Sequence, residues 1–97
     1  MAKGYWITLY RSVSNPDALA EYARLAVPPI QARGGRFVVR ATPAKIYEEG
    51  VNERTVVIEF PTVEDAVAAY NSKQYQAALK VLAGTVERDV RIVEGTS

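Results

Sequence analysis

Residues 54–61, Arg54-Thr55-Val56-Val57-Ile58-Glu59-Phe60-Pro61, carry the strongest strand signal in the chain. Four β-branched residues follow one another, an aromatic residue comes two positions later, and Pro61 ends the run. Side chains alternate between the two faces of a strand. One face is therefore purely apolar and holds Val56, Ile58 and Phe60. The other holds Thr55, Val57 and Glu59, which makes Glu59 a lone carboxylate in an otherwise apolar stretch.

The 97-residue length and the composition predict one small globular domain over residues 1–97, with an ordered core from about residue 4 to residue 95. Twelve basic and eleven acidic residues give a net charge of +1. This balance provides no positive surface for nucleic acid, so we expect no nucleic-acid partner. No stretch is apolar enough for a membrane span or a secretory signal, and we therefore expect a cytoplasmic protein.

The chain contains neither cysteine nor histidine. Disulfides, thiolate catalysis, zinc or iron–sulfur sites built on Cys, His-ligated haem and Ser-His relays are therefore excluded. We expect no metal and no cofactor. The side chains left for chemistry are mainly those of Arg, Glu, Asp, Tyr, Trp and Lys.

Hydrophobic periodicity and the residues that begin or end helices and strands predict a β-α-β-β-α-β order. Asn15-Pro16-Asp17 begins the first helix, which passes Pro28-Pro29 and ends at Gly34-Gly35. The second helical region starts after Thr62, breaks at Asn71-Ser72 and continues to about Ala83. Strands are expected at 5–10, 36–41, 54–61 and 86–93, and residues 45–48 are expected to extend the second strand or form a short separate one. This order is that of a ferredoxin-like α+β fold: a four-stranded antiparallel sheet with helices on one face.

The purely apolar residues of these strands predict the helix-covered face: Ile7, Leu9, Phe37, Val39, Val56, Ile58 and Phe60. The opposite face would then hold Trp6, Thr8, Tyr10, Arg36, Val38, Arg40, Thr55, Val57 and Glu59. Aromatic residues beside arginines are typical of an interface rather than of a solvated surface. We therefore expect a homodimer in which the two sheets pack against each other.

Several motifs together resemble a known family. They are Gly4-Tyr5-Trp6-Ile7, the Tyr22 helix, 34–40 (GGRFVVR), 54–61, the Tyr70 helix, Ser72-x-x-Tyr75 and the closing 92–95 (IVEG). Across about residues 4–95, the chain resembles the small bacterial proteins called domain of unknown function 1330. Members often have Gly after the arginine of the second strand, where this chain has Ala41.

The resemblance implies a ferredoxin-like protomer in a dimeric α+β barrel. It implies no activity, because the family is named for lacking one. The wider superfamily includes cofactor-free monooxygenases, muconolactone isomerases, haem-dependent chlorite dismutases and ligand-sensing regulatory domains. A likeness at this level is an analogy of fold. The absence of histidine argues against the haem branch.

Glu59 has two interpretations. It is a candidate general base if partial burial raises its pKa. Alternatively, it is a structural carboxylate neutralised by an arginine, with Arg40 expected first, then Arg36 and Arg54. The same three arginines are candidate ligands for a small organic acid, or they serve only in ion pairs and solvation.

The aromatic residues also have two interpretations. Five aromatic residues are candidates for a pocket that stacks a planar ligand, or they belong to the core and the dimer interface: Trp6, Tyr10, Tyr22, Tyr70 and Tyr75. We therefore expect a small dimeric protein that binds an organic acid or aromatic compound, with a cofactor-independent enzyme of monooxygenase or isomerase type as one form of this function. The alternative is a non-catalytic ligand-binding or assembly module whose Arg and Glu groups only specify the dimer.

Overall fold

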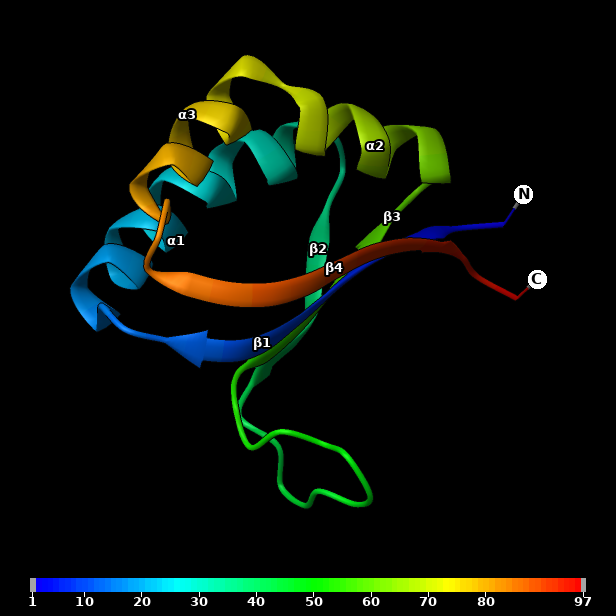
Figure 1. Cartoon of the computed structure of the whole chain (residues 1–97). Coiled ribbons are helices and arrows are strands. Elements are labelled where there is room, and N and C mark those ends of the chain that lie inside the picture. The colour runs from blue at the N-terminus through cyan, green and yellow to red at the C-terminus, as the bar shows by residue number, and fades with distance from the viewer. Residues whose placement is uncertain (1, 97) are drawn as a thin grey trace.

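The computed structural model describes residues 2–96 and has two layers, an antiparallel sheet and three helices on one of its faces (Figure 1). The elements are β1 (Gly4–Val13), α1 (Pro16–Ala32), β2 (Arg36–Ala41), β3 (Thr55–Phe60), α2 (Val63–Asn71), α3 (Lys73–Val81) and β4 (Val86–Glu94). The strand order is β2-β3-β1-β4. The expected ferredoxin-like α+β architecture is confirmed. No helix within residues 2–96 is long and apolar enough to cross a membrane.

The expected helix boundaries are confirmed in atomic detail. The side chain of Asn15 accepts a hydrogen bond from the Ala18 backbone N–H at 3.1 Å and begins α1. The helix continues through Pro28 and Pro29. It ends in a Schellman motif, in which the Gly35 N–H donates to the Ile30 carbonyl at 3.0 Å while Gly34 adopts φ +85°.

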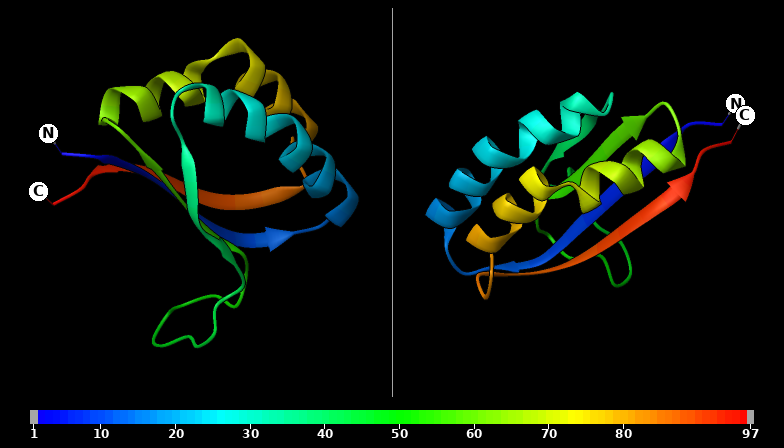
Figure 2. Two further views of the ribbon diagram at one scale, coloured as in Figure 1. Left: turned by 180° about the vertical axis from the view of Figure 1, so that it is seen from behind. Right: turned by 90° about the horizontal axis from the view of Figure 1, so that it is seen from above.

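A serine separates the other two helices. Thr62 caps α2 by accepting a hydrogen bond from the Asp65 N–H, and Ser72 caps α3 by accepting one from the Tyr75 N–H, each at 3.1 Å. Seen from above, α1 lies alongside the α2–α3 row over the same sheet face (Figure 2). At the far end of the sheet, the beginning of β1 and the end of β4 are joined by the Gly95 N–H, which donates to the Lys3 carbonyl at 2.7 Å.

The orientation predicted for β1 is wrong. Trp6, Thr8 and Tyr10 are buried beneath the helices, whereas Leu9 is exposed on the open face. The indole N–H of Trp6 donates to the Thr8 hydroxyl at 2.9 Å, so both polar groups are satisfied inside the core. A large aromatic ring with a satisfied polar atom gains more from burial than Ile or Leu does, and an alternating pattern of aliphatic residues therefore does not identify the inner face.

β2 changes face because of a β-bulge. Phe37 pairs with Ile58, but the register shifts before Val39, which pairs with Val57. Directly paired residues point to the same face. Val39, expected under the helices, therefore lies on the open face, and Arg40 lies on the helix side rather than beside Glu59.

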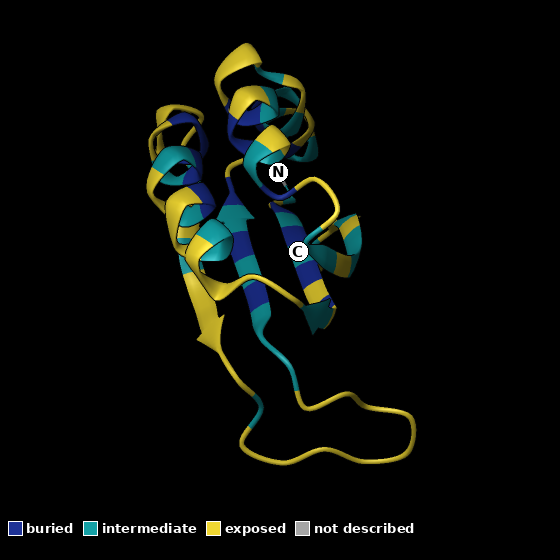
Figure 3. Ribbon diagram, turned by 60° about the vertical axis from the view of Figure 1, so that its left-hand side comes forward, coloured by how far each residue is buried: buried dark blue, intermediate teal, exposed yellow. Residues whose placement is uncertain are grey.

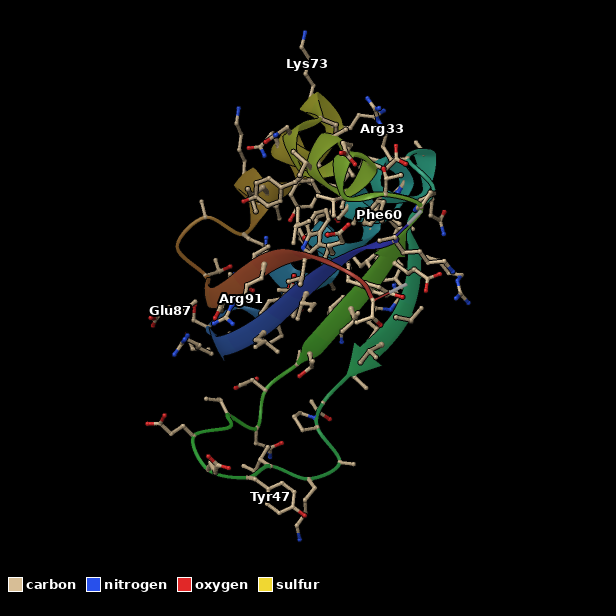
Figure 4. All side chains as sticks on the ribbon, turned by 90° about the vertical axis from the view of Figure 1, so that its right-hand side faces the viewer. Arg33, Tyr47, Phe60, Lys73, Glu87 and Arg91 are labelled. Atoms are coloured by element: carbon tan, nitrogen blue, oxygen red, sulfur yellow. The ribbon has the colours of Figure 1, made fainter. Side chains whose placement is uncertain are left out.

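Residues 42–54 form a long loop that extends away from the two layers, and Figure 3 shows it as almost entirely exposed. The strand expected at residues 45–48 is absent, so that prediction is wrong. Pro43 lacks a backbone N–H for a ladder bond, and Glu48 adopts φ +53° in a turn. Tyr47 projects from the far end of this loop, whereas Phe60 lies between the sheet and the helices (Figure 4).

Candidate functional site

A cavity of about 230 Å³ lies between α1 and the helix-covered face of the sheet. Every strand and α1 contribute to its walls. The lining residues are Trp6, Thr8, Tyr10, Pro16, Leu19, Ala20, Tyr22, Ala23, Ala26, Val27, Ile30, Phe37, Arg40, Arg54, Val56, Ile58 and Arg88.

Strand register divides the sheet wall of this cavity into rows. At one end, Phe37, Ile58 and Trp6 are neighbours on β2, β3 and β1. This end is apolar and is closed by Ile30 near the C-terminal end of α1. The Trp6 ring stacks on that of Phe60, with centroids 6.2 Å apart, and is thereby held in place.

The other end is polar. Tyr10 on β1 pairs with Arg88 on β4, and the Tyr10 N–H donates to the Arg54 carbonyl at 3.1 Å. Tyr10 therefore stands in the sheet between two arginines. α1 begins over this end, where Leu19 and Tyr22 face the strands. The cavity thus runs from an end walled by aromatic and aliphatic side chains to an end that holds Tyr10, Arg54 and Arg88.

Arg88 is the centre of the polar end. Its Nη1 donates to the hydroxyls of Tyr22 at 3.2 Å and Tyr10 at 3.3 Å, and its Nη2 donates to the hydroxyl of Tyr75 at 2.8 Å. The guanidinium also lies 5.2 Å from the ring centroid of Tyr22, within the range of a cation–π interaction. Among residues 2–96, no carboxylate forms an ion pair with Arg88.

Burial dominates the electrostatics of this cluster. It raises the pKa of the Tyr75 and Tyr10 phenols above the ordinary value, because the charged phenolate is disfavoured away from water. Burial acts to lower the pKa of Arg88, but the hydroxyls of Tyr22 and Tyr75 outweigh it and raise that pKa. At neutral pH the phenols of Tyr10 and Tyr75 are therefore uncharged beside the Arg88 guanidinium cation.

Two further arginines line the cavity. Arg40 lies over the ring of Phe37 with its guanidinium carbon 4.5 Å from the centroid, and Arg54 lies beside Tyr10. None of the lining residues is acidic. Three cations without a carboxylate give the cavity a positive potential, concentrated by its low-dielectric walls.

The structure brings several of the predicted site residues together. Five of them line the cavity: Trp6, Tyr10, Tyr22, Arg40 and Arg54. Tyr75 lies behind it: fully buried, it is bonded to the Tyr22 hydroxyl at 2.7 Å. The ring of Tyr70 supports the wall from outside, with its centroid 5.4 Å from that of Trp6 and 5.1 Å from that of Tyr75.

Glu59 and Arg36 lie outside the cavity, on the open face of the sheet. They are opposite one another on β3 and β2, and Nη2 of Arg36 is 3.1 Å from Oε1 of Glu59. Lys3 lies 3.3 Å from the same oxygen, and the hydroxyl of Tyr5 donates to the other at 3.0 Å. The expected arginine partner is present, but the order of preference was wrong because the bulge turned Arg40 away.

These contacts determine the ionisation of Glu59. Hydrogen bonds from Arg36, Tyr5 and Lys3 lower the pKa of its carboxyl below the ordinary value. A general base at neutral pH is better served by a raised pKa. The geometry therefore fits a structural ion pair better than a catalytic base.

Arg88 was not among the residues singled out in the sequence. The alternation of residues along β4 could have identified it. Val86, Val90 and Ile92 pack on the core, and Arg88 lies on the same face because every second side chain of a strand does. An arginine among core-facing aliphatic residues is costly unless it has partners. Among residues 2–96, no group of three or more acidic side chains is arranged to hold a metal ion.

Comparison with known proteins agrees with this architecture. The family model described as domain of unknown function (DUF1330) matches residues 3–96. The chain belongs to the DUF1330 family. No curated protein gives a significant match to this DUF1330 protein.

Solved structures resemble it at low sequence identity. A protein of unknown function from Rhodopseudomonas palustris is 16% identical with a TM-score of 0.76, over 99% of this chain and 84% of that one. A dimeric ferredoxin-like protein of unknown function from Bacteroides fragilis is 14% identical with a TM-score of 0.63, over 95% of each chain. SnoaB, a cofactor-independent oxygenase from Streptomyces nogalater, is 9% identical with a TM-score of 0.68, over 100% of this chain and 96% of that one. These likenesses establish the fold.

Proposed function

We propose that this DUF1330 protein binds a small organic acid with an apolar, planar or short aliphatic body in the cavity beneath α1. The observation that carries the proposal is the composition of the lining: aromatic and aliphatic side chains with Arg40, Arg54 and Arg88, and no acidic residue. An apolar pocket with a few convergent polar groups is the usual form of a small-molecule site. Unneutralised arginines select an anion.

The experiment uses the only tryptophan in the chain, Trp6, as its reporter, because its ring forms part of the cavity wall. The probes are benzoate, phenylacetate and hexanoate, with benzamide and benzylamine as neutral and cationic controls of matched shape. We expect the carboxylates to change Trp6 emission and to release or absorb heat in titration calorimetry. Equal binding of benzoate and benzamide, or no binding of any carboxylate, would refute the proposal.

Catalysis on the bound acid is the second candidate function. The oxygenase from Streptomyces nogalater has a similar fold and needs no cofactor. In this chain, however, the cavity lining contains no carboxylate to act as a base, and Glu59 is held in ion pairs on the opposite face. Binding without turnover is therefore the better-supported function. Catalysis requires a product. Mass spectrometry of each carboxylate after prolonged incubation with the protein in air therefore tests this second candidate function.

The same proposal includes a homodimer formed through the open face of the sheet. Apolar side chains are exposed there at Leu9, Val39 and Val93, with Ile7 and Val57 between them. Contiguous exposed apolar residues on a small domain are typical of a protein interface. The relatives described as dimeric share this fold. Glu59 and Arg36 would then specify the packing of the two sheets, as the assembly-module hypothesis expects.

A further inference from the structure

The Arg88 cluster contains more hydrogen-bond donors than acceptors. It has one guanidinium and the hydroxyls of Tyr10, Tyr22 and Tyr75. Each phenolic oxygen already accepts a hydrogen bond from Arg88. Of the three phenolic hydrogens, only one has an acceptor among residues 2–96, the one shared between Tyr22 and Tyr75. Two O–H donors are left over.

The direction of the bond between Tyr22 and Tyr75 follows from burial. Tyr75 is fully buried and does not line the cavity, so a phenolic hydrogen not donated to Tyr22 would have no acceptor. Leaving a buried donor unsatisfied carries the full free-energy cost of removing that group from water. Tyr75 therefore donates to Tyr22. The hydrogen of Tyr22, which does line the cavity, is then free to point into it.

Tyr10 supplies the second free hydrogen. Its hydroxyl accepts from Arg88 at 3.3 Å and has no acceptor of its own among the described residues, and its side chain also lines the cavity. Two phenolic donors thus lie at the same end of the cavity, and the oxygen of each accepts a hydrogen bond from Nη1 of Arg88, which lines the cavity with them. Hydrogen bonds arranged in such a chain strengthen one another.

We infer that Tyr10 and Tyr22, backed by Arg88 and Tyr75, form the anchor for the ligand's carboxylate, with the ligand's apolar body directed toward Trp6 and Phe37. A carboxylate has two oxygens that share one negative charge, and the two hydroxyl donors can each bind one of these oxygens. The opposite end of the cavity offers the aromatic and aliphatic side chains of Trp6, Ile58 and Phe37, with the Arg40 guanidinium over the Phe37 ring. The preferred ligand class is therefore a carboxylate with an apolar body, which specifies the proposed function on which this inference rests.

The test measures dissociation constants for the tightest of benzoate, phenylacetate and hexanoate. Tyr22→Phe and Tyr10→Phe each remove one hydroxyl and keep the ring. A hydrogen bond to a charged group contributes enough that each change should weaken binding about tenfold or more. Arg88→Gln should weaken it further, and thermal melts identify any variant that fails to fold. Tyr47→Phe is the matched control, because it removes the same hydroxyl from an exposed loop tyrosine that does not line the cavity, and it should leave the dissociation constant unchanged.

Ligand polarity gives an independent measurement. Adding a neutral hydroxyl at the far end, as in 4-hydroxybenzoate compared with benzoate, should weaken binding because that group would meet the rings of Trp6 and Phe37. Tighter binding of 4-hydroxybenzoate than of benzoate would contradict the inferred orientation. If wild-type protein binds benzoate and both tyrosine variants bind it equally well, the anchor is overturned while the proposed function stands. If wild-type protein binds no carboxylate, the proposed function fails, and the anchor fails with it.

Discussion

The hydroxyls of Tyr22 and Tyr75 lie 2.7 Å apart and join α1 to α3 above the sheet. The two residues are 53 positions apart in the chain, and Arg88 donates to both from the sheet below. These three hydrogen bonds therefore join α1, α3 and β4 at the edge of the cavity. Their strength affects both the stability of the fold and the shape of the candidate site.

The first prediction concerns this contact. Tyr75→Phe keeps the ring but removes an acceptor of Arg88 and a donor to Tyr22, leaving both short of a partner in a buried place. The free energy of unfolding should fall by about 1–3 kcal/mol. Urea denaturation at neutral pH measures the change. Tyr47→Phe is the control, since Tyr47 is 73% exposed on the loop and should be neutral. An unchanged Tyr75→Phe variant would mean that the cluster adds nothing to stability.

The second prediction is an alkaline loss of stability. Burial raises the pKa of Tyr75 and Tyr10, so these phenols keep their protons in the folded state above about pH 10, where an unfolded tyrosine loses its own. Their contribution is complete below about pH 10 and declines as pH rises toward the folded-state pKa, by up to about 1.4 kcal/mol per pH unit for each group. Urea midpoints between about pH 8 and 11 should fall more steeply for wild type than for Tyr75→Phe.

How much the sequence could reveal differs between local and long-range features. The caps at Asn15, Thr62 and Ser72 and the β-branched run in β3 are local patterns, and they predicted the starts of the helices and the position of β3 correctly. Local sequence patterns could not predict which face of β1 is buried. Both faces of that strand are rich in apolar atoms, so the choice depends on which side chains find partners in the core, as Trp6 and Thr8 do.

The candidate site shows the same limit. Trp6, Tyr22, Arg40 and Arg54 could be selected by residue type. The position of Arg40 in the cavity depends on the β-bulge after Phe37, which no local pattern in the sequence predicts. Arg88 gains its significance only from tyrosines on β1, α1 and α3. Parity along β4 indicated that it faces inward, yet its partners could be known only from the tertiary structure.

The third prediction concerns Glu59. Hydrogen bonds from Arg36, Tyr5 and Lys3 lower its pKa, so its stabilising contribution is present above the unfolded-state value of about 4.3 and is lost as pH falls through the folded-state pKa. Glu59→Gln should therefore lower the melting temperature modestly at neutral pH, and the difference from wild type should vanish in strong acid. Glu49→Gln, an exposed loop carboxylate, is the control. A Gln variant more stable than wild type at neutral pH would contradict the ion-pair role and favour a strained, functional carboxylate.

The fourth prediction is that the protein is a dimer in solution. Trp6 is unsuitable as a test, because it belongs to the core, and Trp6→Glu would unfold the domain whatever its assembly. Val57 is suitable, because it is the central residue of the open face, paired with Ile7 on β1 and with Val39 on β2. Val57→Lys should convert the dimer to a monomer in light scattering at micromolar concentration, since a buried ammonium without a partner is costly in an apolar interface.

The matched control is Val67→Lys, which places the same charge at an exposed position on α2, in the helical layer. It should leave the mass unchanged, and both variants should retain wild-type helical and strand content by circular dichroism. Because the cavity lies on the other side of the sheet, the Val57→Lys monomer should still bind benzoate. A monomeric wild type would remove the sheet-face dimer, and a Val57→Lys dimer would move the interface to the loop 42–54 or to the helices. Loss of benzoate binding in a folded monomer would instead show that the second copy completes the cavity.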